Sequence, residues 1–75
     1  MRNIKFPVII EKDADGYFAI CPDLQGCYTQ GETYEQALSN IKEVIDLIIE
    51  DMTENGEEIS APDEVSFTSV ELAVK

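Results

Sequence analysis

The sequence predicts an α+β fold with the element order βββαβ. Three observations predict it. Short β-rich segments separated by turn residues occupy the first 30 positions, a helical repeat of apolar residues follows, and an alternating apolar segment lies near the C-terminus. With 75 residues the chain is the size of one small domain. We therefore expect a single domain over residues 1–75.

The first three segments predict an antiparallel three-stranded meander. Residues 4–10 form the first strand, because apolar side chains recur there at period two. Asp15-Gly16 is a hairpin signal, since its turn needs positive φ. Residues 17–21 then form the second strand, and residues 27–30 form a short third strand. Four residues are expected to shape the turns: Gly16, Pro22, Gly26 and Gly31.

The next segment predicts a helix that begins at Thr33. Its hydroxyl can cap the helix, and Gln36 three residues later completes a capping box. Asn55-Gly56 is expected to end the helix. Apolar residues between these ends follow a 3.6-residue spacing that predicts one core-facing stripe: Tyr34, Ala37, Leu38, Ile41, Val44, Ile45, Ile48 and Met52.

The C-terminal segment predicts a fourth strand. Val70, Leu72 and Val74 alternate there with Ser69, Glu71 and Ala73. A right-handed crossover through the helix would set this strand parallel to the first and give the sheet order 3-2-1-4. This order resembles the first part of the ribonuclease H fold.

The sheet face opposite the helix predicts a homo-oligomer. One helix covers one face only, and the other face is expected to be too apolar for simple exposure to solvent. Ile9, Tyr17, Ala19, Cys21 and Tyr28 are assigned to that face. Leu47 and Ile49, which lie off the centre of the helix stripe, are added to the expected contact surface.

Charge is the strongest signal in the composition. Sixteen acidic and five basic residues give a net charge of −11, and residues 43–64 hold nine carboxylates without any Lys or Arg. This disfavours direct nucleic-acid binding and favours a basic protein partner, although a solvated acidic surface would look the same. The sequence has neither a membrane-spanning apolar run nor the features of a signal peptide, so we expect a cytoplasmic protein.

The two cysteines raise the question of a metal site or a disulfide. The chain has no histidine, and Cys21 and Cys27 alone cannot complete a tetrahedral zinc site, so no metal or cofactor is predicted. A disulfide across the turn is conceivable. A reducing cytosol instead favours free thiols that act as small packing residues.

The sequence offers few of the residue combinations that enzymes use for catalysis. Without histidine there is no ordinary Ser-His or Cys-His pair. A two-metal nuclease would need acids on the first strand, the helix and the fourth strand. Glu11, Glu43 and Glu71 are the candidates, but the middle of the first strand is Val8-Ile9, so the set is incomplete. We expect no enzyme.

One series of motifs resembles a known family. Phe6-Pro7-Val8-Ile9-Ile10-Glu11, Asp15-Gly16-Tyr17, Cys21-Pro22-Asp23-Leu24, Gly26-Cys27 and Gly31-Glu32-Thr33 look like the N-terminal domain of HicB-type antitoxins. The resemblance implies a degenerate ribonuclease H-like fold without nuclease activity. It also implies a partner, a small basic HicA-type toxin that cleaves messenger RNA. Many family members continue into a DNA-binding domain. This sequence ends at Lys75, so none is expected here.

The expected toxin contacts are chosen by charge and exposure. They combine the turn before the third strand with acids of the helix end and the loop after it: Asp23, Leu24, Gln25, Glu50, Asp51, Glu54, Glu57 and Glu58. The alternative is a stand-alone oligomeric interaction or regulatory module of the same fold without a toxin.

Overall fold

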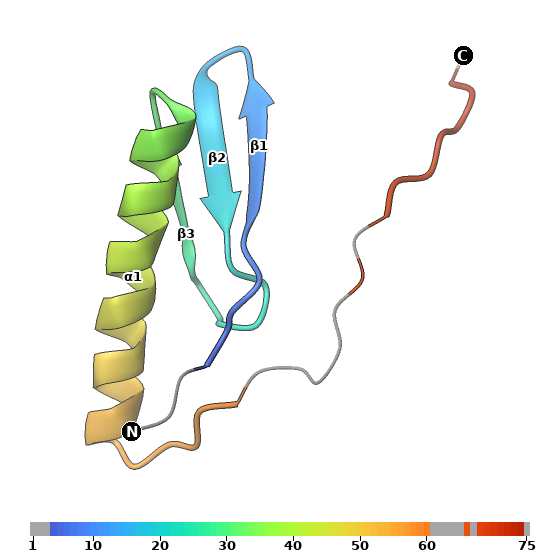
Figure 1. Ribbon diagram of the computed structural model, residues 1–75. Coiled ribbons are helices and arrows are strands. Elements are labelled where there is room, and N and C mark those ends of the chain that lie inside the picture. Colours follow the sequence, from blue (N-terminus) through green and yellow to red (C-terminus); the bar gives the residue numbers. More distant parts are fainter. Residues whose placement is uncertain (1–3, 61–65, 67, 75) are drawn as a thin grey trace.

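The computed structural model describes residues 4–60, 66 and 68–74. Three strands precede one helix: β1 (Ile9–Asp13), β2 (Gly16–Ile20), β3 (Tyr28–Gly31) and α1 (Tyr34–Glu54). The strands form an antiparallel sheet in the order β1-β2-β3, and α1 runs along one face of it (Figure 1). The α+β class and the three-stranded meander are thereby confirmed.

The first strand lies later in the chain than predicted. It was expected over residues 4–10, but β1 begins at Ile9 and continues to Asp13. The reason lies in its partner strand, because Ile9 pairs with Ile20 at the end of β2. The next N–H, that of Cys21, donates to the carbonyl of Cys27 at 2.9 Å instead. Residues before Ile9 therefore have no strand opposite them, and Pro7 lacks an N–H to donate.

The β1–β2 hairpin is built around the predicted Asp15-Gly16 signal. Asp13 pairs with Gly16, which leaves a two-residue loop. The Asp15 N–H donates to the Asp13 carboxylate at 2.8 Å, and Gly16 has a φ of 135°. This short loop fixes the register, so Ile10 stands opposite Ala19.

Both predicted ends of the helix are confirmed. Thr33 is the N-cap, and its hydroxyl oxygen accepts a hydrogen bond from the Gln36 N–H at 3.0 Å. The Gln36 side chain in turn accepts from the N–H of Glu32, one residue before the cap. At the other end Asn55 is the C-cap, and Gly56 follows it with a φ of 71°.

Gly31 is required for a reason other than the predicted turn. Its backbone does not have a positive φ. A Cβ at this position would lie 2.5 Å from the Ala37 nitrogen and 2.9 Å from the Ala37 Cα. A side chain here would therefore collide with the backbone of α1. Next to this contact, the Asn40 side-chain amide donates to the Gln30 carbonyl at 2.9 Å and ties α1 to β3.

The hydrophobic core lies between α1 and the sheet. Its buried members are Ala19, Cys21, Leu24, Cys27, Ala37 and Ile41. Further apolar residues pack against these but stay partly exposed: Phe6, Val8, Ile10, Tyr17, Leu38, Val44, Ile45, Ile48, Ile49 and Met52. The predicted helix stripe is confirmed except for Tyr34, whose side chain is 49% exposed.

The predicted fourth strand is not seen in the part of the C-terminal segment that is described. Residues 66 and 68–74 have no assigned strand, and Val70, Leu72 and Val74 are 77%, 76% and 89% exposed. Figure 1 shows residues 68–74 running apart from the sheet. The observed strand order corresponds to 3-2-1 of the predicted 3-2-1-4, and the fourth position stays a prediction.

Candidate functional site

The loop between β2 and β3 holds three of the residues predicted to contact a partner. Asp23 and Gln25 are exposed, but Leu24 is only 7% exposed and belongs to the hydrophobic core. The prediction that Leu24 is a surface contact is therefore wrong, because the loop folds over this side chain. The buried Leu24 side chain anchors the loop to the core, while Asp23 and Gln25 are exposed to solvent.

Backbone hydrogen bonds hold this loop in a compact shape. The Cys21 N–H donates to the Cys27 carbonyl at 2.9 Å, and the Leu24 N–H donates to the Cys21 carbonyl at 3.2 Å. The N–H of Cys27 donates to the Leu24 carbonyl at 3.4 Å. The exposed residues of the loop are thus presented on a preorganised backbone.

Cys21 and Cys27 are buried free thiols at the base of the loop. Burial is the main cause that raises the pKa of the Cys21 thiol above its ordinary value, although the Asp23 backbone N–H opposes this by hydrogen bonding. Burial also raises the pKa of Cys27, and the neighbouring Cys21 adds to the effect. Both thiols therefore stay protonated and unreactive near neutral pH, as packing residues do.

The remaining predicted contact residues form an acidic end of the helix. Glu50, Asp51, Glu54, Glu57 and Glu58 are all exposed. The last turn of α1 contains no basic residue. Since the C-terminus of a helix carries partial negative charge, carboxylates there repel the helix dipole, at about 0.3–1 kcal/mol each. This end of the molecule is electrostatically unfavourable for the isolated chain.

The loop and the acidic helix end occupy the same end of the molecule. In Figure 1 the β2–β3 loop closes the lower end of the sheet, beside the lower half of α1. The C-terminal half of the helix contributes Ile48 and Met52 to the core that contains Leu24. Asp23 and the helix acids therefore present negative charge at one end of the fold.

The sheet face that points away from α1 differs from its prediction. Residues opposite one another in adjacent strands share a face, so Ala19 lies on the same face as Ile10, against the helix. Ala19 and Cys21 are fully buried and Tyr17 packs against the core. Their assignment to the open face is wrong, because the hairpin register places them on the other side.

The open face carries two residues that were predicted there, Ile9 and Tyr28, and two that the sequence interpretation missed, Phe18 and Ile20. Ile9, Ile20 and Tyr28 are opposite one another across the three strands, and Phe18 joins them. The rings of Phe18 and Tyr28 stack with centroids 6.1 Å apart, and Tyr28 is 59% exposed. The two-residue hairpin loop was the signal that could have found Phe18 and Ile20, since counting back from it gives the register.

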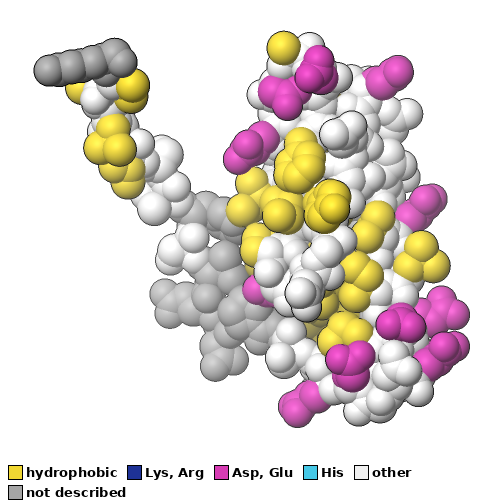
Figure 2. All heavy atoms as spheres, turned by 180° about the vertical axis from the view of Figure 1, so that it is seen from behind, with side chains coloured by type: hydrophobic (Ala, Val, Ile, Leu, Met, Phe, Trp, Pro, Cys, Tyr) yellow, Lys and Arg dark blue, Asp and Glu magenta, His cyan; other side chains and the backbone are white. Residues whose placement is uncertain are grey.

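Two helix residues were also predicted to lie on a contact surface. Leu47 is 67% exposed, as that prediction requires, whereas Ile49 is partly buried against the core. Figure 2 shows the molecule from the side opposite to Figure 1. Hydrophobic side chains gather over the middle of that side, with acidic side chains above and below them, and no Lys or Arg of the described residues is visible there.

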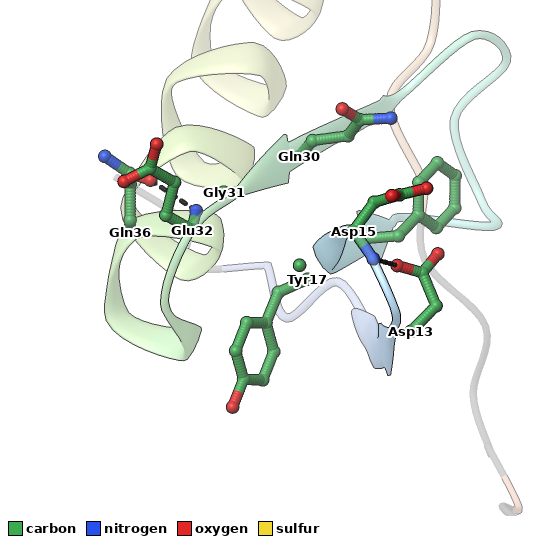
Figure 3. Close-up of a pocket in the computed structure, with 9 residues that line it drawn as sticks. Asp13, Asp15, Tyr17, Gln30, Gly31, Glu32 and Gln36 are labelled. Carbon is green, nitrogen blue, oxygen red and sulfur yellow. Dashed lines mark hydrogen bonds between the residues drawn. The ribbon is translucent and has the colours of Figure 1, made fainter.

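A cavity of about 410 Å³ opens beside the β1–β2 hairpin. Its lining residues are Asp13, Asp15, Gly16, Tyr17, Phe18, Gln30, Gly31, Glu32 and Gln36. Figure 3 shows Asp13 and Asp15 on one side of it and Glu32 with Gln36 on the other. The side chains of Asp13 and Gln36 already accept local backbone hydrogen bonds from the turn and the helix cap. Two polar side chains of this cavity, those of Asp13 and Gln36, therefore help to shape the chain itself.

The three acids considered for a nuclease lie in different parts of the structure. Glu11 is on the open side of β1, Glu43 is exposed on α1, and Glu71 is in the C-terminal segment. Among residues 4–60, 66 and 68–74, no group of three His, Cys, Asp or Glu side chains is arranged to hold a metal ion. The described residues therefore offer no support for the two-metal site.

Comparison with known proteins identifies a family. The family model described as the HicB-like antitoxin of bacterial toxin-antitoxin systems matches residues 6–73. A UPF0150 protein of Helicobacter pylori is 46% identical over 66 residues, which cover 88% of this chain and 81% of the relative. A UPF0150 protein of Thermotoga maritima is 34% identical over 96% of this chain and 97% of its own length.

Further comparisons extend this range of relatives. A UPF0150 protein of Thermoplasma acidophilum is 49% identical over 57 residues, which cover 75% of this chain and 83% of the relative. No solved structure matches the chain significantly. Of the described segments, α1 is the only helix, and it is not long and apolar enough to cross a membrane.

Proposed function

We propose that this chain, which belongs to the HicB-like antitoxin family of bacterial toxin-antitoxin systems, binds and inhibits a basic HicA-type toxin that cleaves messenger RNA. The observation that carries the proposal is the family match, which spans residues 6–73. The chain would act in the cytoplasm without chemistry of its own, by covering the surface with which the toxin engages RNA.

The distribution of charge supports a basic partner. The net charge is −11, and acids gather at the C-terminal end of α1, where they are unfavourable for the helix. A basic surface docked there would relieve this repulsion and also accelerate encounter by electrostatic steering. The same charge opposes direct binding of this chain to nucleic acid.

The proposed toxin surface combines the β2–β3 loop with the acidic helix end. Asp23 and Gln25 would contact the toxin from the loop, and Glu50, Asp51 and Glu54 from α1. Glu57 and Glu58 extend the surface beyond the helix. Leu24 has a different part in this proposal, because its buried side chain holds the loop in position without touching the partner.

Self-association is the second part of the proposal. Ile9, Phe18, Ile20 and Tyr28 give the open sheet face an apolar centre, and exposed apolar patches of this kind mark interaction surfaces. We expect a homo-oligomer whose completed sheet has the order 3-2-1-4, with the C-terminal segment as the fourth strand. That arrangement would be ribonuclease H-like in part.

A stand-alone interaction or regulatory module is the alternative function. The apolar open face favours it, because such a face supports self-association whether or not a toxin exists. The gene neighbourhood separates the two functions. A small, Lys-rich open reading frame with a central histidine beside the gene supports the antitoxin, and the absence of one supports the module.

Co-purification tests toxin binding directly. A tagged toxin from the neighbouring gene should retain the chain at low salt and release much of it at high salt, because the proposed contacts are mainly ionic. A variant with Glu50, Asp51 and Glu54 replaced by Gln should be retained less. A variant with Glu32, Glu35 and Glu43 replaced by Gln removes the same number of charges away from the proposed surface, so it is the matched control and should bind as the wild type does. If the toxin retains the wild type, the test variant and the control equally, the proposed surface is contradicted.

A further inference from the structure

The two edges of the sheet are protected to different degrees. At one edge β3 lies under α1, and the Asn40 side chain donates to the Gln30 carbonyl of this strand. At the other edge β1 pairs with β2 alone among the described residues. An unprotected strand edge presents free backbone donors and acceptors, which makes it a template for another strand.

The C-terminal segment has the properties of such a strand. Its apolar residues alternate with small or polar ones, and Val70, Leu72 and Val74 are 77%, 76% and 89% exposed. Three exposed branched side chains at period two are typical of a strand that has one face to bury. The described segment does not bury them against its own sheet (Figure 1).

The core also lacks cover on the side of β1. The helix packs mostly against β3 and β2 and reaches β1 least. Phe6, Val8 and Ile10, which belong to β1 or lead into it, pack against the core but remain partly exposed. A strand added at this edge would place its apolar side chains beside Val8 and Ile10 and would extend the core under the free side of α1.

Charge distinguishes the C-terminal segment from the rest of the chain. Two copies that each carry −11 repel one another, and the acids concentrate between residues 43 and 64. Residues 66–75 contain one acid, Glu71, and one base, Lys75, so their net charge is zero. This segment can therefore approach a second acidic copy with little repulsion, which the helix end cannot do.

From these observations we infer that residues 68–74 of one copy add to the β1 edge of a second copy. The exchange is reciprocal, so both free edges and both apolar segments are paired in one symmetric dimer. In the sequence, residues 55–67 are the connection between α1 and the segment that is exchanged. The inference rests on the self-association proposed above, whose fourth strand it assigns to the partner copy, and does not depend on toxin binding.

The full-length chain tests the inference in two steps. Light scattering should give twice the mass of one chain at micromolar concentration. A dimer assembled from ¹³C-labelled and unlabelled chains should then show filtered nuclear Overhauser effects between the methyl groups of Leu72 or Val74 in one chain and those of Val8 or Ile10 in the other. A monomeric wild type would overturn the inference. So would a dimer in which these contacts are absent or arise only within one chain.

A substitution provides an independent readout. Leu72→Asp should halve the mass measured by light scattering while circular dichroism retains the signal of α1. Ser60→Asp, an exposed position in the connection, adds the same charge and should leave the dimer intact. A Leu72→Asp variant that stays dimeric would contradict the exchange. A wild-type chain that is monomeric and still captures the toxin would overturn the exchange alone. An exchanged wild-type dimer that does not bind the toxin would overturn the antitoxin function alone.

Discussion

Replacing Gly31 with alanine tests the close packing of β3 against α1. The new Cβ would lie 2.5 Å from the Ala37 nitrogen and 2.9 Å from the Ala37 Cα. Non-bonded carbon atoms prefer about 3.5–4.0 Å, so the first turn of α1 must retreat by about 1 Å. Overpacking of this kind costs about 1–3 kcal/mol, and backbone obstacles place Gly31→Ala near the upper figure.

The loss is large for a domain of this size. At about 0.05–0.15 kcal/mol per residue, a chain of 75 residues has a free energy of unfolding of about 4–11 kcal/mol. A loss of about 3 kcal/mol should lower Tm by about 12–24 °C for a small domain. Thermal and urea unfolding followed by circular dichroism, at one fixed protein concentration, measures both quantities.

Gly56→Ala is the control for this substitution. Gly56 has a φ of 71° with open space around it, so alanine there meets backbone strain of about 1–2 kcal/mol but no collision. Gly31→Ala should therefore be the more damaging of the two. If the free energy of unfolding of Gly31→Ala lies within about 0.5 kcal/mol of the wild-type value, α1 does not approach β3 as closely as described.

Three further predictions concern the cap, the core and the buried thiols. Thr33→Ala removes the hydroxyl that accepts the Gln36 N–H and should cost about 0.5–2 kcal/mol in urea unfolding. Ile41→Ala, at a fully buried site, should cost about 2–5 kcal/mol, whereas Leu47→Ala, at an exposed site of the same helix, should change stability by less than about 0.5 kcal/mol. Burial raises the pKa of the Cys21 thiol in the folded state. The contribution of this thiol to the free energy of unfolding is therefore fully present below the ordinary thiol pKa, and it is lost as pH rises through the pKa of the folded state. In urea unfolding from pH 7 upward, the wild type should lose stability, and the Cys21→Ala variant should lose less. If both proteins lose the same amount, the buried Cys21 thiol is not a cause of the pH dependence.

Local signals in the sequence predicted most of the helix. Thr33 and Gln36 sit three residues apart, and their hydrogen bonds depend only on neighbouring backbone, so the N-terminus of α1 could be predicted from the sequence. Asn55-Gly56 defined the other end in the same way. The class of the fold followed, because three β-rich segments before one amphipathic helix leave few other arrangements.

Long-range geometry accounts for the elements that the sequence did not predict correctly. The face on which Ala19 lies depends on the register of the hairpin, and a shift by one residue moves every side chain of a strand to the other face. Leu24 looked like an exposed turn residue, but its burial depends on how the loop folds over the core. Gly31 looked like a turn glycine, and only the approach of Ala37 shows why a side chain is excluded.

The candidate site could be predicted only in part, because the placement of some of its residues also depends on long-range geometry. The exposure of Asp23 and of the helix acids follows from their charge, because isolated carboxylates are rarely buried. Which surface they contact depends on a partner whose shape this chain does not encode. Phe18 and Ile20 were missed because their place on the open face requires the strand register.

Inhibition of a toxin by the purified chain tests the central proposal most directly. The assay follows cleavage of a messenger RNA by the basic toxin from the neighbouring gene as the chain is added. The proposed function predicts that cleavage stops when chain and toxin are equimolar, and that replacing Glu50, Asp51 and Glu54 by Gln raises the amount of chain required. Cleavage that continues at an unchanged rate in the presence of excess folded chain would contradict it.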